Sequence, residues 1–116
     1  MSVPLKSSQA LTLWREVALH EVVNREHDLT TRQMAILLTI YMEPPPHTVR
    51  GLAARLNVTK PVITRALDTM GQMKLVTRRR DPNDRRNVII GKTVEGALYL
   101  DRFSDMIVDK AKWLPK

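Results

Sequence analysis

Residues 59–73, TKPVITRALDTMGQM, predict a short helix that buries one face and exposes the other. Apolar side chains recur at the spacing i, i+3, i+4 and i+7 of a helix laid on a core, at Ile63, Ala66, Leu67 and Met70. On the opposite face, about 200° around the helical wheel from Ile63, lie Pro61 and Arg65, with Val62 and Thr64 flanking them. That face is basic and its side chains are short, so it has nothing to bury.

The start of this helix is well specified. Thr59 is placed to be the N-cap, and Val58 and Ile63 have the spacing of a hydrophobic staple. Because Pro61 has no N–H, we expect the Thr59 hydroxyl to accept its hydrogen bond from the amide of Val62. An ordinary amphipathic helix with a solvated face would fit these residues equally well, so the neighbouring segments decide its role.

The preceding segment predicts a second short helix, which completes a helix-turn-helix over 48–73. Thr48 can cap this helix, and Asn57 tolerates the left-handed conformation in which helices often end. The apolar residues again follow the helical spacing, at Val49, Leu52, Ala53 and Leu56. A turn of about three residues matches DNA-binding units that offer the second helix to a groove, although many helical proteins contain such corners.

The following segment predicts a β-hairpin over 75–92. Residues 75–80 and 87–92 are of strand type, and 81–86, DPNDRR, are rich in turn formers. Between Lys74 and Arg86 there are six positive residues and two negative ones. A solvated turn needs no such imbalance, so the charge favours a wing that faces phosphate.

Two helices precede this core. Ser7 or Ser8 can cap the first, which we expect to run to about Arg25, with apolar residues at Leu11, Trp14, Ala18 and Val22. Thr30 and Gln33 form a capping box for the second, whose body is apolar nearly all round and therefore central to the core. Three consecutive prolines, 44–46, end it.

Thr93 can cap a last helix whose apolar residues cover more than one stripe. We expect one side to be buried in its own domain and another in a partner chain. These residues are Val94, Ala97, Leu98, Leu100, Phe103, Met106, Ile107 and Trp113. The expected fold is mainly α with a small β-hairpin wing, a winged helix-turn-helix. It would be one domain over 1–116, with 1–28 and 93–116 as flanking helices.

Charge is concentrated in the middle of the 116-residue chain. Residues 1–47 carry four Lys/Arg and five Asp/Glu, residues 48–92 carry eleven and three, and residues 93–116 carry four of each. A confined basic segment implies a polyanionic partner, with nucleic acid ahead of an anionic membrane surface. With no cysteine, no signal-peptide pattern and no run long enough to cross a bilayer, we expect a cytoplasmic protein.

Catalytic motifs are missing from the sequence. It has no G-x-S-x-G, no phosphate-binding glycine loop and no metal-ligand spacing. His20 and His27 do not form an H-E-x-x-H arrangement, and the carboxylates near them are scattered. We therefore expect no enzyme activity, no cofactor and no metal.

The run LAARLNVTKPVITRALDTMGQMKLVTRRRDPNDRRNVIIGKTVEG, residues 52–96, resembles the MarR family of bacterial transcriptional regulators. The motifs that match are LAARLNVTK followed by TRALDTM, then MKLV, then DPNDRR, then GKTVEG. The resemblance covers about residues 29–103. It implies a homodimer that binds pseudo-palindromic double-stranded DNA, usually as a repressor, and is often released by small phenolic or other aromatic ligands.

The same resemblance implies which residues contact DNA. The recognition-helix contacts would come from Thr59, Lys60, Pro61, Val62, Thr64 and Arg65. In the wing, Arg86 would enter the minor groove with Asp84 as its positioner, and a narrow minor groove does attract a guanidinium. Arg65 can reach either a guanine edge or a phosphate. Contacts to the phosphate backbone are expected from Thr48, Arg50, Lys74 and 78–80, and Arg85 belongs to the same basic tip.

Two features differ from the family pattern. Family members commonly continue into a further C-terminal helix that completes the dimer and lines part of the ligand pocket, whereas this sequence ends at Lys116. We therefore expect a dimer that is smaller or built differently, or no dimer. Because the same helices line part of the ligand pocket, we expect an effector site that is likewise altered or absent. Without cysteine, peroxide sensing by a thiol is excluded.

A protein-interaction module and a ligand-independent architectural DNA binder are the alternative functions.

Overall fold

The computed structural model describes residues 4–24 and 26–116. Its elements are α1 (Ser7–Val23), α2 (Thr31–Met42), β1 (His47–Thr48), α3 (Val49–Leu56), α4 (Lys60–Gln72), β2 (Val76–Arg80), β3 (Val88–Lys92) and α5 (Val94–Lys112). Five helices with one small sheet confirm the expected fold class, a winged helix-turn-helix. No described helix is long and apolar enough to cross a membrane.

The chain divides into two compact units. Unit 1 contains residues 1–28 and 100–116, and unit 2 contains residues 29–99. Helix α5 begins in unit 2 and continues into unit 1. The assignment of the whole chain to one domain stays a prediction.

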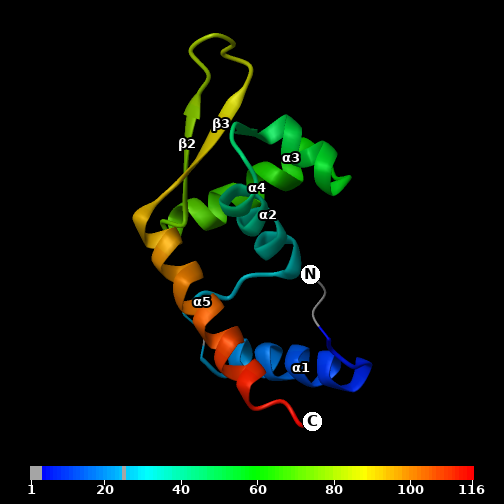
Figure 1. Cartoon of the computed structure of the whole chain (residues 1–116). Helices are drawn as coiled ribbons and strands as arrows, with labels where there is room; N and C mark the ends of the chain where they lie inside the picture. The colour runs from blue at the N-terminus through cyan, green and yellow to red at the C-terminus, as the bar shows by residue number, and fades with distance from the viewer. Residues whose placement is uncertain (1–3, 25) are drawn as a thin grey trace. The chain divides into compact units, whose positions relative to one another are not determined.

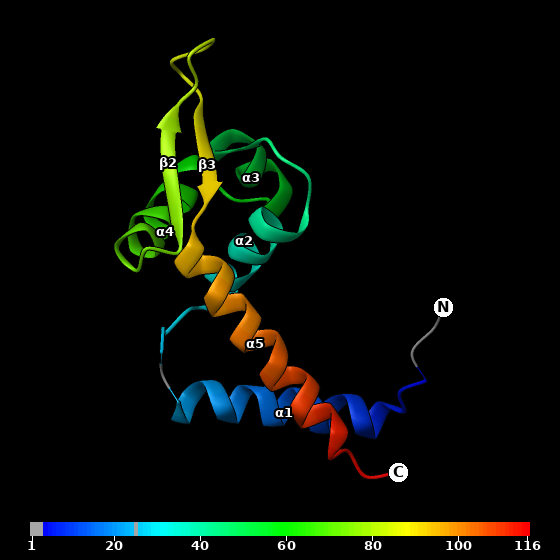
Figure 2. The same cartoon turned by 60° about the vertical axis from the view of Figure 1, so that its left-hand side comes forward.

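The sheet of unit 2 is antiparallel with strand order β1-β3-β2. Strands β2 and β3 form the expected hairpin, in which Val76 pairs with Lys92 and Arg80 with Val88. Both views show this hairpin projecting beyond the helices of unit 2 (Figure 1, Figure 2). Strand β1 was not expected, because two residues that pair with Ile89 and Ile90 are too few to show a strand period.

The largest fully buried side chains of unit 2 come from α2, from α4 and from the residue before β2. The apolar stripe expected for α4 is buried: Ile63, Leu67 and Met70 are completely covered, and Ala66 nearly so. The other fully buried large side chains are Ile36, Leu37, Ile40 and Leu75. Burial of this stripe leaves the opposite face of α4 outside.

Helix starts in unit 2 follow the expected caps. The Thr30 hydroxyl accepts from the N–H of Gln33 at 3.1 Å, and the Gln33 side chain accepts from the N–H of Thr30 at 2.9 Å. Thr48 and Thr93 cap α3 and α5 in the same way, each accepting from the N–H three residues later at 2.9 Å. These bonds satisfy amides that have no partner inside a helix.

Each helix of the helix-turn-helix is followed by a residue with a left-handed backbone conformation. Asn57 has φ 57°, as expected, while Lys74 after α4 has φ 62°. The N–H groups of Lys74 and Leu75 donate to the carbonyls of Gly71 and Met70, both at 3.0 Å, which is a Schellman motif. Lysine adopts this conformation less readily than glycine, so the sequence did not predict it.

A hydrogen-bonded group, here called the Tyr41 cluster, joins three segments of unit 2 and consists of Tyr41, Lys74, Leu75, Thr93 and Gly96. The Tyr41 hydroxyl donates to the Leu75 carbonyl at 2.7 Å and accepts from the N–H of Thr93 at 2.9 Å. The Thr93 hydroxyl donates to the Lys74 carbonyl at 2.7 Å. A Cβ atom on Gly96 would overlap the Tyr41 hydroxyl and the Leu75 carbonyl oxygen. The cluster therefore fixes the starts of the wing and of α5 against α2.

Unit 1 corrects the expected start of the first helix. Lys6 is its N-cap, not Ser7 or Ser8, and the Gln9 side chain accepts from the Lys6 N–H at 3.0 Å. The helix ends at Val23; Arg25, the expected end, lies outside the described residues. An ion pair between Glu26 and Arg102 joins the chain after α1 to α5.

One carboxyl in unit 1 is perturbed. Burial raises the pKa of Glu21 above 4.5; the charge of His20 opposes this shift and that of Glu26 adds to it. A raised pKa means that the folded state binds more protons than the unfolded state. Stability contributed by this group is therefore present at acid pH and is lost as the pH rises above about 4.5.

The Tyr41 cluster gives a first prediction. Gly96→Ala should lower the free energy of unfolding by about 1–3 kcal/mol or more, because the added methyl group displaces the Tyr41 hydroxyl. The matched control is Gly71→Ala in α4, where an added Cβ meets no atom within 4 Å and alanine gains about 0.5–1 kcal/mol as the better helix former. Urea denaturation measures both; equal midpoints for the two variants would contradict the close packing at Gly96.

Candidate nucleic-acid interface

The outward face of α4 is formed as the sequence predicted. Thr59, Lys60, Pro61, Thr64 and Arg65 are exposed, and Val62 is half-buried. Their exposure follows directly from burial of the stripe one half-turn away. The face therefore offers hydroxyl, ammonium and guanidinium groups, with two short apolar side chains among them.

Thr59 differs from the expectation in one respect. It is the N-cap residue of α4 with an extended backbone, but its side chain makes no capping hydrogen bond. The amide of Val62 donates instead to the Thr59 backbone carbonyl at 3.1 Å. Pro61 removes the N–H that a cap commonly uses at this turn, and the backbone carbonyl satisfies the next one. The hydroxyl is thus left on the surface.

Arg65 is held along its own helix. Its Nε donates to the Pro61 carbonyl at 3.3 Å, and Thr69 donates to the Arg65 carbonyl at 3.2 Å. The side chain is therefore folded toward the start of α4. The N–H groups of its two terminal nitrogens remain available as hydrogen-bond donors. This geometry is compatible with both contacts expected for Arg65, to a guanine edge or to a phosphate.

The tip of the hairpin is ordered by its own acidic residues. Asp84 accepts from the backbone N–H of Arg86 at 3.1 Å and from its Nε at 3.3 Å. Asp81 accepts from the N–H of Asn83 at 2.8 Å, and Arg80 donates to the Arg85 carbonyl at 2.8 Å. The Arg86 side chain is nonetheless 85% exposed. The carboxylate thus orients a guanidinium that remains open to solvent.

Arg78 is engaged within the protein. Its Nη1 lies 2.7 Å from Oδ1 of Asp68 on α4. Arg78 and the buried Val76 are two residues apart on β2, so they face the same side of the strand. The ion pair joins the wing to α4, and no local sequence pattern predicts it because the partners lie on different elements.

The remaining expected contact residues are Thr48, Arg50, Lys74 and Arg85. Arg50 and Arg85 are exposed and form no ion pair among the described residues. Lys74 is exposed in its left-handed turn. Thr48 is half-buried, with its oxygen occupied as the cap of α3.

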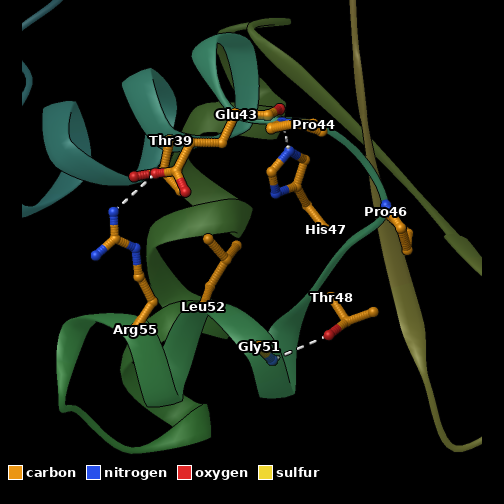
Figure 3. A pocket seen from close by; sticks show the side chains of 9 residues that line it. All are labelled: Thr39, Glu43, Pro44, Pro46, His47, Thr48, Gly51, Leu52 and Arg55. Carbon is orange, nitrogen blue, oxygen red and sulfur yellow. Dashed lines mark hydrogen bonds and ion pairs between the residues drawn. The ribbon is translucent and has the colours of Figure 1, made fainter.

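A separate cavity of about 230 Å³ lies between the end of α2 and α3 (Figure 3). Arg55 pairs with Glu43 at 3.0 Å on one side of it, and the buried His47 lies 3.0 Å from the Glu43 carbonyl through Nε2. Its other lining residues are Thr39, Pro44, Pro46, Thr48, Gly51 and Leu52. Arg55 and Glu43 are partners of each other, and none of the residues that line the cavity belongs to α4 or to the wing.

Comparison with known proteins places the chain in a family. The model of the MarR family matches residues 29–88, more than half of the chain, so the chain belongs to the MarR family. A crystal structure of MarR is 25% identical, with a TM-score of 0.69 over 95% of this chain and 79% of that one.

Several similar structures contain DNA, and two of them illustrate the likeness. A complex of S. aureus MepR with DNA is 23% identical, with a TM-score of 0.74 over 91% of this chain and 84% of that one. A mutant MarR from E. coli, complexed with operator DNA, is 23% identical, with a TM-score of 0.66 over 90% and 69%. At these identities the likeness establishes the fold.

The two threonine caps of the helix-turn-helix give a second prediction. Thr48→Ala should lower the free energy of unfolding by about 1 kcal/mol, because the N–H of Gly51 loses its acceptor. Thr59→Ala should cost less than about 0.5 kcal/mol, because its hydroxyl caps nothing. Thermal or urea unfolding of the two variants checks this; an equal loss would show that Thr59 also caps its helix.

Proposed function

We propose that this protein is a sequence-specific double-stranded DNA-binding transcriptional regulator that represses by occupying a promoter. The observation that carries the proposal is the hairpin tip, where Asp84 orients an exposed Arg86. This tip and the basic face of α4 both lie inside the segment that matches the MarR family. The MepR and MarR complexes with DNA support the proposal.

In this mechanism the outward face of α4 enters the major groove. Lys60 and Arg65 supply positive charge, and the hydroxyls of Thr59 and Thr64 supply hydrogen bonds. Pro61 and Val62 have no side-chain polar atoms, so they would contact thymine methyl groups or sugars. Membership of the MarR family supports the proposal that the outward face of α4 binds a groove of DNA.

The wing would track the minor groove beside it. Arg86 would insert where the groove is narrow and its negative potential is strongest. Because Asp84 already fixes the side chain, little rotamer entropy is lost on insertion. Thr48, Arg50, Lys74 and Arg85 would contact phosphates, and Arg78 would add charge while its pairing with Asp68 holds the wing to α4.

We propose that the protein acts in the cytoplasm as a homodimer formed through unit 1. Apolar side chains on this unit are exposed in the single chain, among them Leu11 at 73% and Trp14 at 70%. Leu19, Val108 and Trp113 are exposed as well. A two-fold dimer would set two recognition helices about 34 Å apart, one helical turn of DNA. A small aromatic effector would act on this assembly.

The dimer has a direct test. Sedimentation equilibrium should give a mass near twice 13.3 kDa for the native chain, and Trp14→Glu should reduce it to the monomer. The control Arg15→Glu introduces the same side chain at the next position, where Arg15 is already exposed and polar. A native monomer at micromolar concentration would rule out binding to two half-sites.

DNA binding is tested by fluorescence anisotropy over a salt series. The probes are a duplex of the gene's own upstream region and a scrambled duplex. Affinity should fall by about 0.9 log units per log unit of salt for each phosphate contact. The upstream duplex should bind about a thousandfold more tightly than the scrambled one. Arg86→Ala should weaken binding roughly tenfold to a hundredfold, while the charge-matched control Arg15→Ala should not.

The contrary result is equally clear. Equal affinity for both duplexes, with Arg86→Ala behaving like Arg15→Ala, would make the wing a charged surface without a specific DNA contact. The basic face would then be assigned to an acidic protein partner.

A further inference from the structure

A basic groove lies between the first turn of α2 and α4, and it adds residues of α2 to the contacts proposed for Val62 and Arg65. Its volume is about 370 Å³. Thr30, Arg32 and Gln33 line it from α2, and Val62, Arg65, Ala66 and Thr69 line it from α4. Arg32 belongs neither to the helix-turn-helix nor to the wing, and sequence reasoning gave it no role.

The groove contains two arginines and no carboxylate. None of the seven residues that line it is acidic, and neither Arg32 nor Arg65 forms an ion pair within the described part of the chain. Asp68 lies three residues after Arg65 on the same helix, at a spacing that allows pairing. It pairs instead with Arg78 at 2.7 Å, which leaves the groove without a counter-charge.

Two other arginine-lined cavities of unit 2 hold an arginine that is already paired, and a third, at the hairpin tip, has the carboxylate of Asp81 beside Arg80 and Arg85. Arg55 lines the cavity beside α3 and is paired with Glu43 at 3.0 Å. Arg78 lines a hollow between α4 and β2 together with its partner Asp68. Two like charges that share a groove repel each other unless an anion lies between them. The groove of Arg32 and Arg65 is therefore suited to an anion from outside the chain.

Several side-chain N–H groups that line the groove remain available as hydrogen-bond donors. Gln33 uses its side-chain oxygen as the acceptor for the Thr30 N–H, so its amide nitrogen keeps both hydrogens for another partner. Arg65 uses only Nε within its helix, so both terminal nitrogens keep their hydrogens. These donors, with the guanidinium of Arg32, match the oxygens of a phosphate.

We propose that this groove binds one phosphodiester of the DNA backbone, shared by Arg32 and Arg65. The inference rests on the proposed function, since the phosphate belongs to the duplex whose major groove receives α4. A phosphate contact fixes the position of the protein on the duplex and carries no base preference. Arg32 thus sets affinity and register, and α2 takes part in DNA binding.

The test is a salt series of anisotropy titrations with Arg32→Ala on the upstream and scrambled duplexes. Arg32→Ala should weaken binding to both duplexes by the same factor, roughly fivefold, and should reduce the salt slope by about 0.9, the value of one phosphate contact. The matched control is Arg55→Ala, which removes an equal charge from a cavity residue that is already paired. It should leave the salt slope unchanged. Circular dichroism confirms that each variant is folded.

A double-mutant cycle tests whether the phosphate is shared. If Arg32 and Arg65 bind the same phosphate, the effect of Arg32→Ala should be smaller in an Arg65→Ala background than in the native protein. Additive effects, an unchanged salt slope for Arg32→Ala, or an equal loss for Arg55→Ala would each overturn the inference.

The failure of the inference and that of the proposed function are distinguishable. If the native protein prefers the upstream duplex and Arg32→Ala is silent, only the groove assignment falls. If the native protein binds neither duplex in a salt-dependent way, the proposed function falls, and the phosphate site with it.

Discussion

The hydrogen bonds of the Tyr41 hydroxyl are the constraint on which the rest of unit 2 depends. One oxygen joins the end of α2 to the Leu75 carbonyl, directly before the wing, and to the Thr93 N–H, directly before α5. Gly96 permits this approach because a side chain there would occupy the position of the hydroxyl. The wing therefore starts at a fixed point relative to α2, and three residues after Leu75 the Asp68–Arg78 ion pair joins it to α4. The Tyr41 hydrogen bonds and the Asp68–Arg78 ion pair together hold the hairpin in place, so that the hairpin and α4 can act as one surface.

Local signals in the sequence predicted much of this fold. The capping residues Thr30, Thr48 and Thr93, the left-handed Asn57 and the buried stripe of α4 depend on neighbours within four residues, so spacing alone reveals them. The Tyr41 cluster, strand β1 and the partner of Arg78 depend on contacts between distant segments, which no local period encodes. Thr59 shows the limit of even a local rule, because the backbone carbonyl took the role expected of its hydroxyl.

The distribution of partners among the basic residues connects structure to function. Arg55, Arg78 and Arg86 pair with Glu43, Asp68 and Asp84. The basic residues of unit 2 without an ion pair among its described residues include Arg32, Arg50, Lys60, Arg65, Lys74 and Arg85. Two of the three carboxylates of the central segment, Asp68 and Asp84, thus pair with arginines, and the third, Asp81, accepts from the N–H of Asn83. The segment therefore keeps a net charge of +8, which suits the polyanionic partner proposed for it.

The central claim is that α4 and the wing contact one duplex as a single surface. The most direct measurement is a titration of the ¹⁵N-labelled protein with the upstream duplex, following backbone amide chemical shifts. We predict that the largest changes occur together at 59–65, at 84–87 and around Arg32, with unchanged shifts for the buried residues Ile36, Leu37 and Ile40. Changes at α4 that leave 84–87 unperturbed, or changes confined to unit 1, would contradict it.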